Sequence, residues 1–112
     1  MPTLGFGTPP NIQSPVDSDN INYYAKTGTL SVLQVLDFPS TSAQNSSDIT
    51  VPVTGAVLND IVLLGVPNGS TLSNSCFTAW VSASNVVTIR FNNYSSGPLD
   101  PASGTFKVRV LK

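Results

Sequence analysis

Strict alternation of apolar and polar residues near the end of the chain constrains the fold more than any other feature. Across segments 84–92 and 105–110, a large apolar residue recurs at every second position: Val87, Ile89, Phe91, Phe106, Val108 and Val110. Because successive side chains of a strand point to opposite faces, this pattern predicts two strands, each with one buried and one solvated face. Residues 94–104 between them are dense in turn-forming residues. We therefore expect the two strands to form an antiparallel part of one sheet.

Four further segments have strand-like composition: residues 28–38, 49–54, 61–66 and 76–82. Pro52 has no backbone N–H to donate, so we expect the second of these segments to be an edge strand. In the first, Leu33 and Val35 place apolar groups on the otherwise polar face, which predicts burial on both sides, with another subunit covering one of them. No amphipathic helical pattern is visible. The sequence predicts an all-β fold, an antiparallel β-sandwich that is jelly-roll-like.

Residues 1–27 differ in composition from residues 28–112, which we expect to form the β-sandwich domain. Prolines at positions 2, 9, 10 and 15 disfavour both helix and central strand, so an extended N-terminal arm is predicted. A free tail would carry fewer large apolar groups than this segment does. The apolar residues expected to anchor the arm are Leu4, Phe6, Ile12, Tyr23 and Tyr24. Their contact surface is either this domain or a neighbouring chain.

The composition argues against most chemistry. The chain has no histidine, one cysteine and six acids, all aspartates, most of which are expected at turns and caps. Histidine-based catalysis is therefore impossible, and no metal site or cofactor is predicted, so we expect a protein that is not an enzyme. Cys76 is expected to be a buried small hydrophobe. The N-terminus lacks the features of a signal peptide, which favours synthesis in the cytoplasm.

Charge is scarce, which bears on the partners of the chain. Charged residues make up 10% of the sequence, where about 25% is usual, and the net charge is −1. Nothing here attracts nucleic acid or an anionic membrane, and no apolar run is long enough for a transmembrane helix. A polar but weakly charged surface is compatible with a subunit that packs against other protein.

A second interpretation concerns carbohydrate. Trp80, Asn92, Asn93 and Tyr94 supply aromatic and amide groups of the kind that bind sugars. Trp80 lies within a predicted strand, however, where an aromatic side chain more often covers a sheet face or a subunit contact. The sequence favours that structural role for Trp80.

Three segments, taken together and in this order, resemble a small β-sandwich domain found in virion proteins of tailed bacteriophages, of the head-decoration or cement type. They are Val53–Leu63, Ala79–Asn93 and Leu99–Val110, and the resemblance spans roughly residues 28–112. One departure is Asn59, where the family pattern more often has glycine before the residue matching Asp60. Asparagine tolerates left-handed backbone angles almost as well as glycine, so we expect the turn to survive.

The resemblance implies a capsid decoration protein on the virion surface, made in the host cytoplasm. Such proteins often sit as homotrimers over junctions between subunits of the major capsid protein. On this hypothesis the arm residues contact neighbouring chains, and Leu33 and Val35 are candidates for a subunit interface. The alternatives are a tail-, fibre- or baseplate-associated component and a carbohydrate-binding module for host adhesion.

Overall fold

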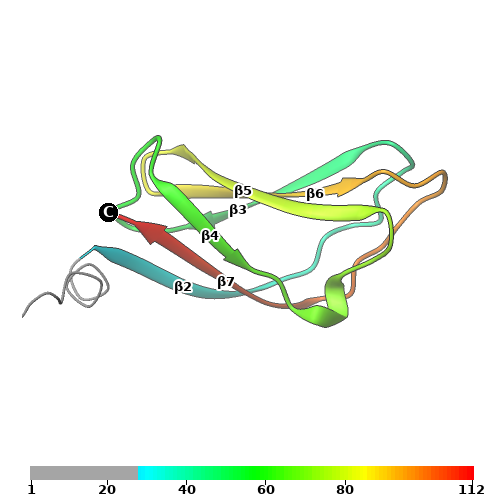
Figure 1. The fold of residues 1–112 in the computed structure, drawn as a ribbon, viewed down its shortest axis with the longest axis horizontal. Coiled ribbons are helices and arrows are strands. Elements are labelled where there is room, and N and C mark those ends of the chain that lie inside the picture. The colour runs from blue at the N-terminus through cyan, green and yellow to red at the C-terminus, as the bar shows by residue number, and fades with distance from the viewer. Residues whose placement is uncertain (1–27) are drawn as a thin grey trace, which may run out of the picture. The chain divides into compact units, whose positions relative to one another are not determined.

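The computed structural model describes residues 28–112, which contain six strands and a single turn of 3₁₀-helix. The elements, in chain order, are β2 (Thr29–Leu36), β3 (Ser46–Pro52), β4 (Ile61–Gly65), η1 (Asn68–Ser70), β5 (Ser75–Ala83), β6 (Val86–Asn93) and β7 (Gly104–Leu111). They form two three-stranded antiparallel sheets with strand orders β2-β7-β4 and β3-β6-β5 (Figure 1). The predicted all-β antiparallel sandwich is therefore confirmed.

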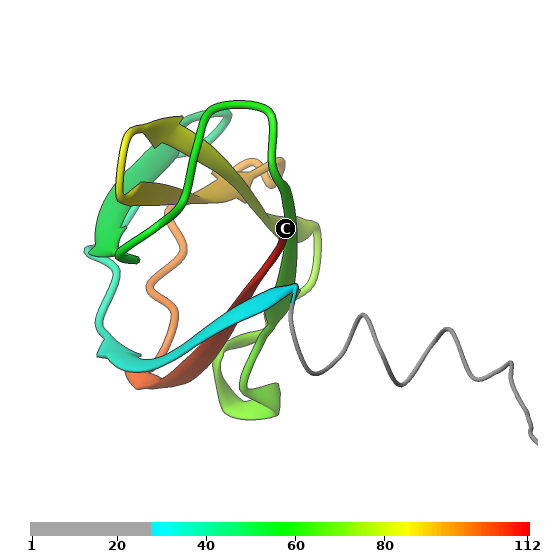
Figure 2. The same ribbon diagram turned by 90° about the vertical axis from the view of Figure 1, so that its left-hand side faces the viewer.

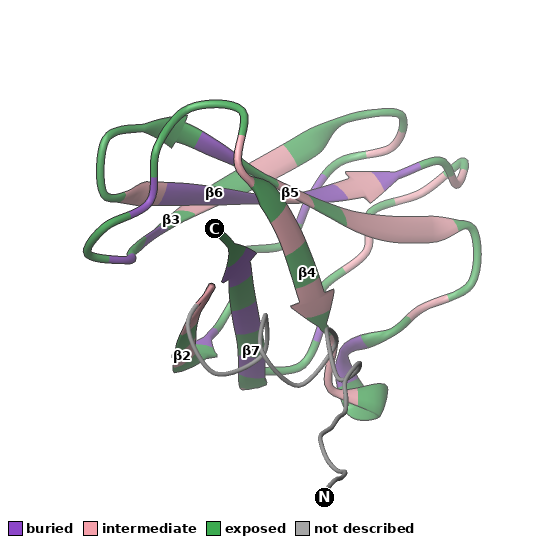
Figure 3. Cartoon of the chain, turned by 60° about the vertical axis from the view of Figure 1, so that its left-hand side comes forward, coloured by how far each residue is buried: buried purple, intermediate pink, exposed green. Residues whose placement is uncertain are grey.

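The two sheets face each other across one apolar core (Figure 2). Buried and exposed residues alternate along β7, so that Phe106, Val108 and Val110 point inward (Figure 3). The opposite sheet contributes alternate residues in the same way: Val51, Val81, Val87, Ile89 and Phe91. The period-two pattern of the sequence thus identified the buried face of these strands correctly.

The predicted pairing of the last two strands is wrong. β6 lies between β3 and β5 in one sheet, whereas β7 lies between β2 and β4 in the other. Both edges of each strand are thus already occupied, and the connection through residues 94–103 crosses from one sheet to the other. A short bridge between Thr41 and Leu99 ties this connection to the segment that leads from β2 to β3.

Four phenylalanine rings join the two sheets within the core, toward the end where β5 and β7 begin and β6 ends. Phe77 and Phe91 come from neighbouring strands of one sheet and Phe106 from the other sheet. Phe38, two residues beyond the end of β2, completes the cluster, with ring centroids 5.3 Å from Phe77 and 5.8 Å from Phe106. The rings meet at tilted or edge-on angles, which aromatic pairs prefer over a face-to-face stack.

Asparagines adopt the left-handed backbone conformation in two of the tight turns. Asn59 has a φ of 76°, and the neighbouring Asp60 accepts a hydrogen bond from the backbone N–H of Val57 at 2.9 Å. The turn expected at Asn59 is therefore present, with the left-handed backbone that asparagine tolerates. Asn85 has a φ of 66° in the two-residue link between β5 and β6. β3 is an edge strand, as Pro52 predicted.

Candidate functional site

The outer face of the β2-β7-β4 sheet is largely apolar, and we call it the apolar face. Leu33 and Val35 of β2 are 64% and 62% exposed, so in this chain they lie open to solvent. Three other large apolar side chains share this face: Ile61, Leu63 and Leu111. Ile61 and Leu111 are direct cross-strand neighbours, which makes the apolar surface continuous from β4 to β7.

Two cations interrupt the apolar face. Lys107 and Arg109 are exposed on β7, directly opposite Gly65 and Leu63 of β4. β2, β4 and β7 carry no acidic residue that could neutralise them within the sheet. This face therefore combines exposed apolar area with two cations that no acid on β2, β4 or β7 neutralises.

The structure tests only some of the residues that the sequence singled out for contacts. Leu4, Phe6, Ile12, Tyr23 and Tyr24 lie outside the described residues, as does the predicted arm of residues 1–27, so these assignments and the domain boundary stay predictions. Leu33 and Val35 both lie on the apolar face. Sequence reasoning missed Ile61 and Leu63 because it treated residues 61–66 as one continuous apolar strand, and it missed Leu111 because the last expected strand ended at Val110. Residues 61–66 also have apolar side chains on both faces of the strand, the same pattern that singled out Leu33 and Val35.

The outer face of the β3-β6-β5 sheet is polar, and we call it the polar face. The strand register places its side chains in three rows: Ser46–Asn92–Cys76, Asp48–Arg90–Thr78 and Thr50–Thr88–Trp80. The prediction that Cys76 is a buried hydrophobe is wrong, because alternation with Phe77 puts its thiol on this outer face. Trp80 lies on the polar face as a strand residue and is 38% exposed, a position that both of its expected roles allow.

Asp48 and Arg90 form the centre of the polar face. Two hydrogen bonds of 2.8 and 3.0 Å join the guanidinium to both carboxylate oxygens, and this contact lowers the pKa of Asp48 below its usual value. It also raises the pKa of Arg90. Asp48 therefore does not occupy the turn or cap position expected for the aspartates. The Arg90 guanidinium also lies 4.9 Å from the centre of the Trp80 ring, a cation–π contact.

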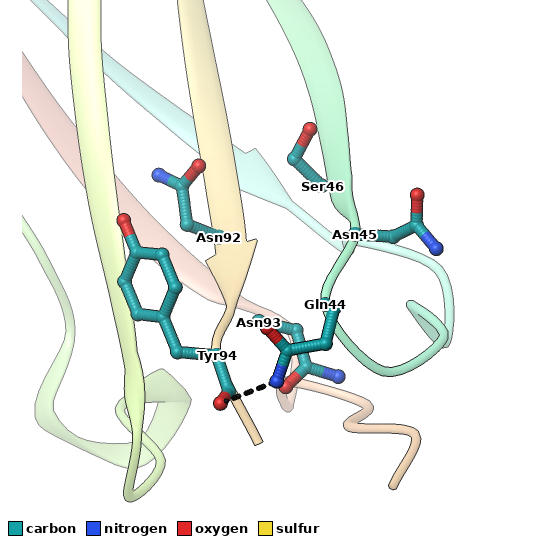
Figure 4. A pocket seen from close by; sticks show the side chains of 6 residues that line it. All are labelled: Gln44, Asn45, Ser46, Asn92, Asn93 and Tyr94. Atoms are coloured by element: carbon teal, nitrogen blue, oxygen red, sulfur yellow. Dashed lines mark hydrogen bonds between the residues drawn. The ribbon is translucent and has the colours of Figure 1, made fainter. Parts of the chain in front are cut away.

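A pocket of about 300 Å³ opens at the end of the polar face where β3 begins and β6 ends (Figure 4). Its lining is entirely polar and uncharged: Gln44, Asn45, Ser46, Asn92, Asn93 and Tyr94. Gln44 closes one side by donating from Nε2 to the carbonyl oxygens of Tyr94 and Ser95, each at 3.0 Å. The Tyr94 side chain is 60% exposed.

The hydroxyl of Tyr94 lies 3.5 Å from the sulfur of Cys76. This hydrogen bond is the main reason that the pKa of Tyr94 is raised. The contact places the Tyr94 hydroxyl beside β5, at the side of the pocket.

The four residues proposed for sugar binding do not act as one set. Asn92 and Tyr94 line the pocket together, and Trp80 lies further along the polar face. Asn93 is only 1% exposed, and its amide is committed to the backbone. It donates to the carbonyl oxygens of Thr41, Ser42 and Gly97 and accepts from the N–H and hydroxyl of Ser95. Asn93 therefore forms the floor of the pocket.

Within residues 28–112, no group of three or more His, Cys, Asp or Glu side chains is placed to hold a metal ion. The described residues also contain no helix of the length and hydropathy that crossing a membrane requires. Comparison of the chain with protein-family models, with curated proteins and with solved structures finds no match in any of the three. The candidate sites are therefore the apolar face and the pocket on the polar face.

Proposed function

We propose that the protein is a virion structural protein of a tailed bacteriophage, a decoration or cement protein that binds the outside of the head across capsomer junctions. The single observation that supports this best is the apolar face, with five large apolar side chains exposed on one side of a rigid sandwich. The likeness of three of its segments to phage virion domains agrees with it. A contiguous exposed apolar patch often marks a contact with other protein.

The charges of the apolar face favour a particular kind of contact. A two-fold interface would bring the same patch of both copies together and so place Lys107 and Arg109 near their own copies. In a ring of three copies each interface joins two different surfaces, so the cations avoid their counterparts. Exposed acids outside this sheet, Asp37 and Asp100, offer complementary charge on a neighbouring copy. This supports a homotrimer in which Leu33 and Val35 contribute to the subunit interface.

In this proposal the second partner is the major capsid protein. Burial of apolar area contributes roughly 25 cal/mol per Å², and a trimer that spans a junction gains further from binding several sites at once. Residues 1–27, with their five apolar anchors, provide additional contacts to neighbouring chains. The protein thus stabilises the shell by adding buried area between capsomers.

The oligomeric state of the purified full chain tests the proposal. Light scattering on a sizing column should give a trimer for the wild type. The double variant Leu33→Asp, Val35→Asp should be monomeric with an unchanged far-UV circular dichroism spectrum, because both side chains are exposed in the single chain. The matched control Thr50→Asp, Ser82→Asp adds the same charge to exposed positions of the other sheet and should remain trimeric.

A monomeric wild type would contradict the trimeric cement proposal. A second measurement separates the head from the tail. A cement protein should be present in many copies per mature particle, and heads without it should break at lower temperature. A copy number of only a few per particle would instead assign the chain to a tail, fibre or baseplate component.

A further inference from the structure

We propose that the pocket at the end of the polar face binds a neutral saccharide. The ring of Tyr94 would stack on the sugar, and Asn92, Gln44 and Ser46 would hydrogen-bond to its hydroxyl groups. This inference does not rest on the proposed cement function, because the pocket and the apolar face lie on the outer sides of different sheets. A chain docked through its apolar face would keep the pocket open.

The size and lining of the pocket indicate the ligand class. Ligand pockets usually measure roughly 300–1,000 Å³, so this one accommodates a small ligand of about one or two sugar rings. The lining is more polar than that of most ligand pockets, and one aromatic ring beside several uncharged polar groups suits a polyhydroxylated ligand better than an apolar one. Tyr94 supplies the exposed ring, which can lie against the C–H groups of a sugar.

Several polar groups that line the pocket have hydrogen-bonding positions that no other group of the described residues occupies. Gln44 and Asn92 both use their amide N–H groups in the structure, at 3.0 Å in Gln44 and at the longer 3.5–3.6 Å in Asn92. Within residues 28–112, the amide oxygens of both residues and the hydroxyl of Ser46 make no hydrogen bond. They are therefore available to accept from, and in Ser46 also donate to, a polyhydroxylated ligand.

The charges favour a neutral ligand. Asp48 and Arg90 are the only charged residues of β3, β5 and β6, and each is paired with the other through two hydrogen bonds. No unpaired cation on these strands would attract a phosphate, sulfate or carboxylate group. Tyr94 adds no charge, because its hydroxyl is neutral near pH 7 as in any unperturbed tyrosine, and the contact with Cys76 raises its pKa further. The site should therefore show no preference for acidic sugars.

Trp80 provides an internal control on the same face. It lies four residues from Cys76 along β5, roughly 13 Å away, whereas Tyr94 touches Cys76. One side of its ring is also occupied by Arg90. A mono- or disaccharide bound at Tyr94 should therefore not depend on Trp80.

The experiment is a titration of the ¹⁵N-labelled full chain, followed by amide chemical shifts, with maltose, lactose, cellobiose and chitobiose as probes. At least one should bind with a Kd of about 1 mM or below and shift the amides of Gln44, Asn92 and Tyr94. Tyr94→Ala and Asn92→Ala should each weaken binding by roughly tenfold, and Trp80→Ala should leave the Kd unchanged. Tyr94→Phe should retain most of the affinity.

Three outcomes would overturn the proposal. One is that none of the four neutral sugars shifts these amides. Another is that binding survives Tyr94→Ala but is lost in Trp80→Ala, which would place the site elsewhere on the face. The third is that sialyllactose binds more than about tenfold tighter than lactose, which would require a cation that the pocket lacks. The melting temperature of each variant, measured in parallel, shows whether it is folded.

Discussion

At the scale of single residues, Asn93 is the side chain on which the local structure depends most. Its buried amide makes five hydrogen bonds, which hold the segment after β2 and the loop after β6 together. Asn93→Ala would remove all five bonds, although only the backbone N–H of Ser95 would lose its sole partner, because the other four groups each make a second hydrogen bond. We therefore expect the free energy of unfolding to fall by about 1–3 kcal/mol. Urea denaturation followed by tryptophan fluorescence measures this change.

The adjacent Asn92 is a matched control. It has the same side chain but faces outward, where its amide makes only long contacts. Asn92→Ala should change the free energy of unfolding by less than about 0.5 kcal/mol. Equal effects of the two substitutions would show that the Asn93 network does not stabilise the fold.

The sequence held enough information to separate these two asparagines. Alternation through Val87, Ile89 and Phe91 continues to residue 93, which places Asn93 inward and Asn92 outward. The same rule, applied from Phe77, places Cys76 on the outer face, and the error arose because the general tendency of cysteine to be buried was given more weight. What alternation could not supply is the set of partners of Asn93, since they come from loops distant in sequence.

At the scale of elements, the start of β7 is packed closely against the turn that contains η1. A Cβ atom added at Gly104 would lie 2.7 Å from Cγ of Pro67 and 3.2 Å from the hydroxyl oxygen of Ser70. The proline ring is rigid, so the strand or the turn would have to move. We expect Gly104→Ala to lower the free energy of unfolding by about 1–3 kcal/mol.

Gly97 provides the comparison, because nothing lies within 4 Å of a Cβ placed there and its φ is not positive. Gly97→Ala should therefore be neutral or slightly stabilising in the same denaturation experiment, through a lower entropy of the unfolded chain. If Gly104→Ala were also neutral, β7 and the η1 turn would not be in close contact.

Each expected strand exists in the structure, with ends that shift by a few residues, but the partner of each strand was less predictable. Local alternation decides whether a segment is a strand, whereas pairing depends on contacts between residues far apart in the chain. β6 and β7 look like neighbours in sequence and belong to different sheets. In β2 and β4 the sequence showed apolar residues on both faces of the strand. Their joining on one surface required knowledge of the strand order β2-β7-β4.

At the scale of the whole sandwich, the two sheets share one apolar core but differ in their outer faces, one of which is apolar and the other polar. The apolar face suits contact with protein, and the polar face suits a small neutral ligand. The side chains of both faces point outward, so neither face contributes contacts between the sheets. Both faces therefore keep their shape only while the inward side chains hold the sheets together. The ring cluster of Phe38, Phe77, Phe91 and Phe106 joins the sheets within the core, toward the end where β5 and β7 begin.

We therefore expect the two sheets to unfold in a single transition. Trp80, the only tryptophan, reports on the β3-β6-β5 sheet, and hydrogen exchange of the β7 amides reports on the other. Both probes should give the same midpoint in urea. Phe38→Ala removes a fully buried ring, so it should lower both midpoints together, with a loss of about 3–5 kcal/mol. If the β7 amides exchanged at a urea concentration where Trp80 fluorescence is still native, the sheets would be separate units and the ring cluster would not couple them.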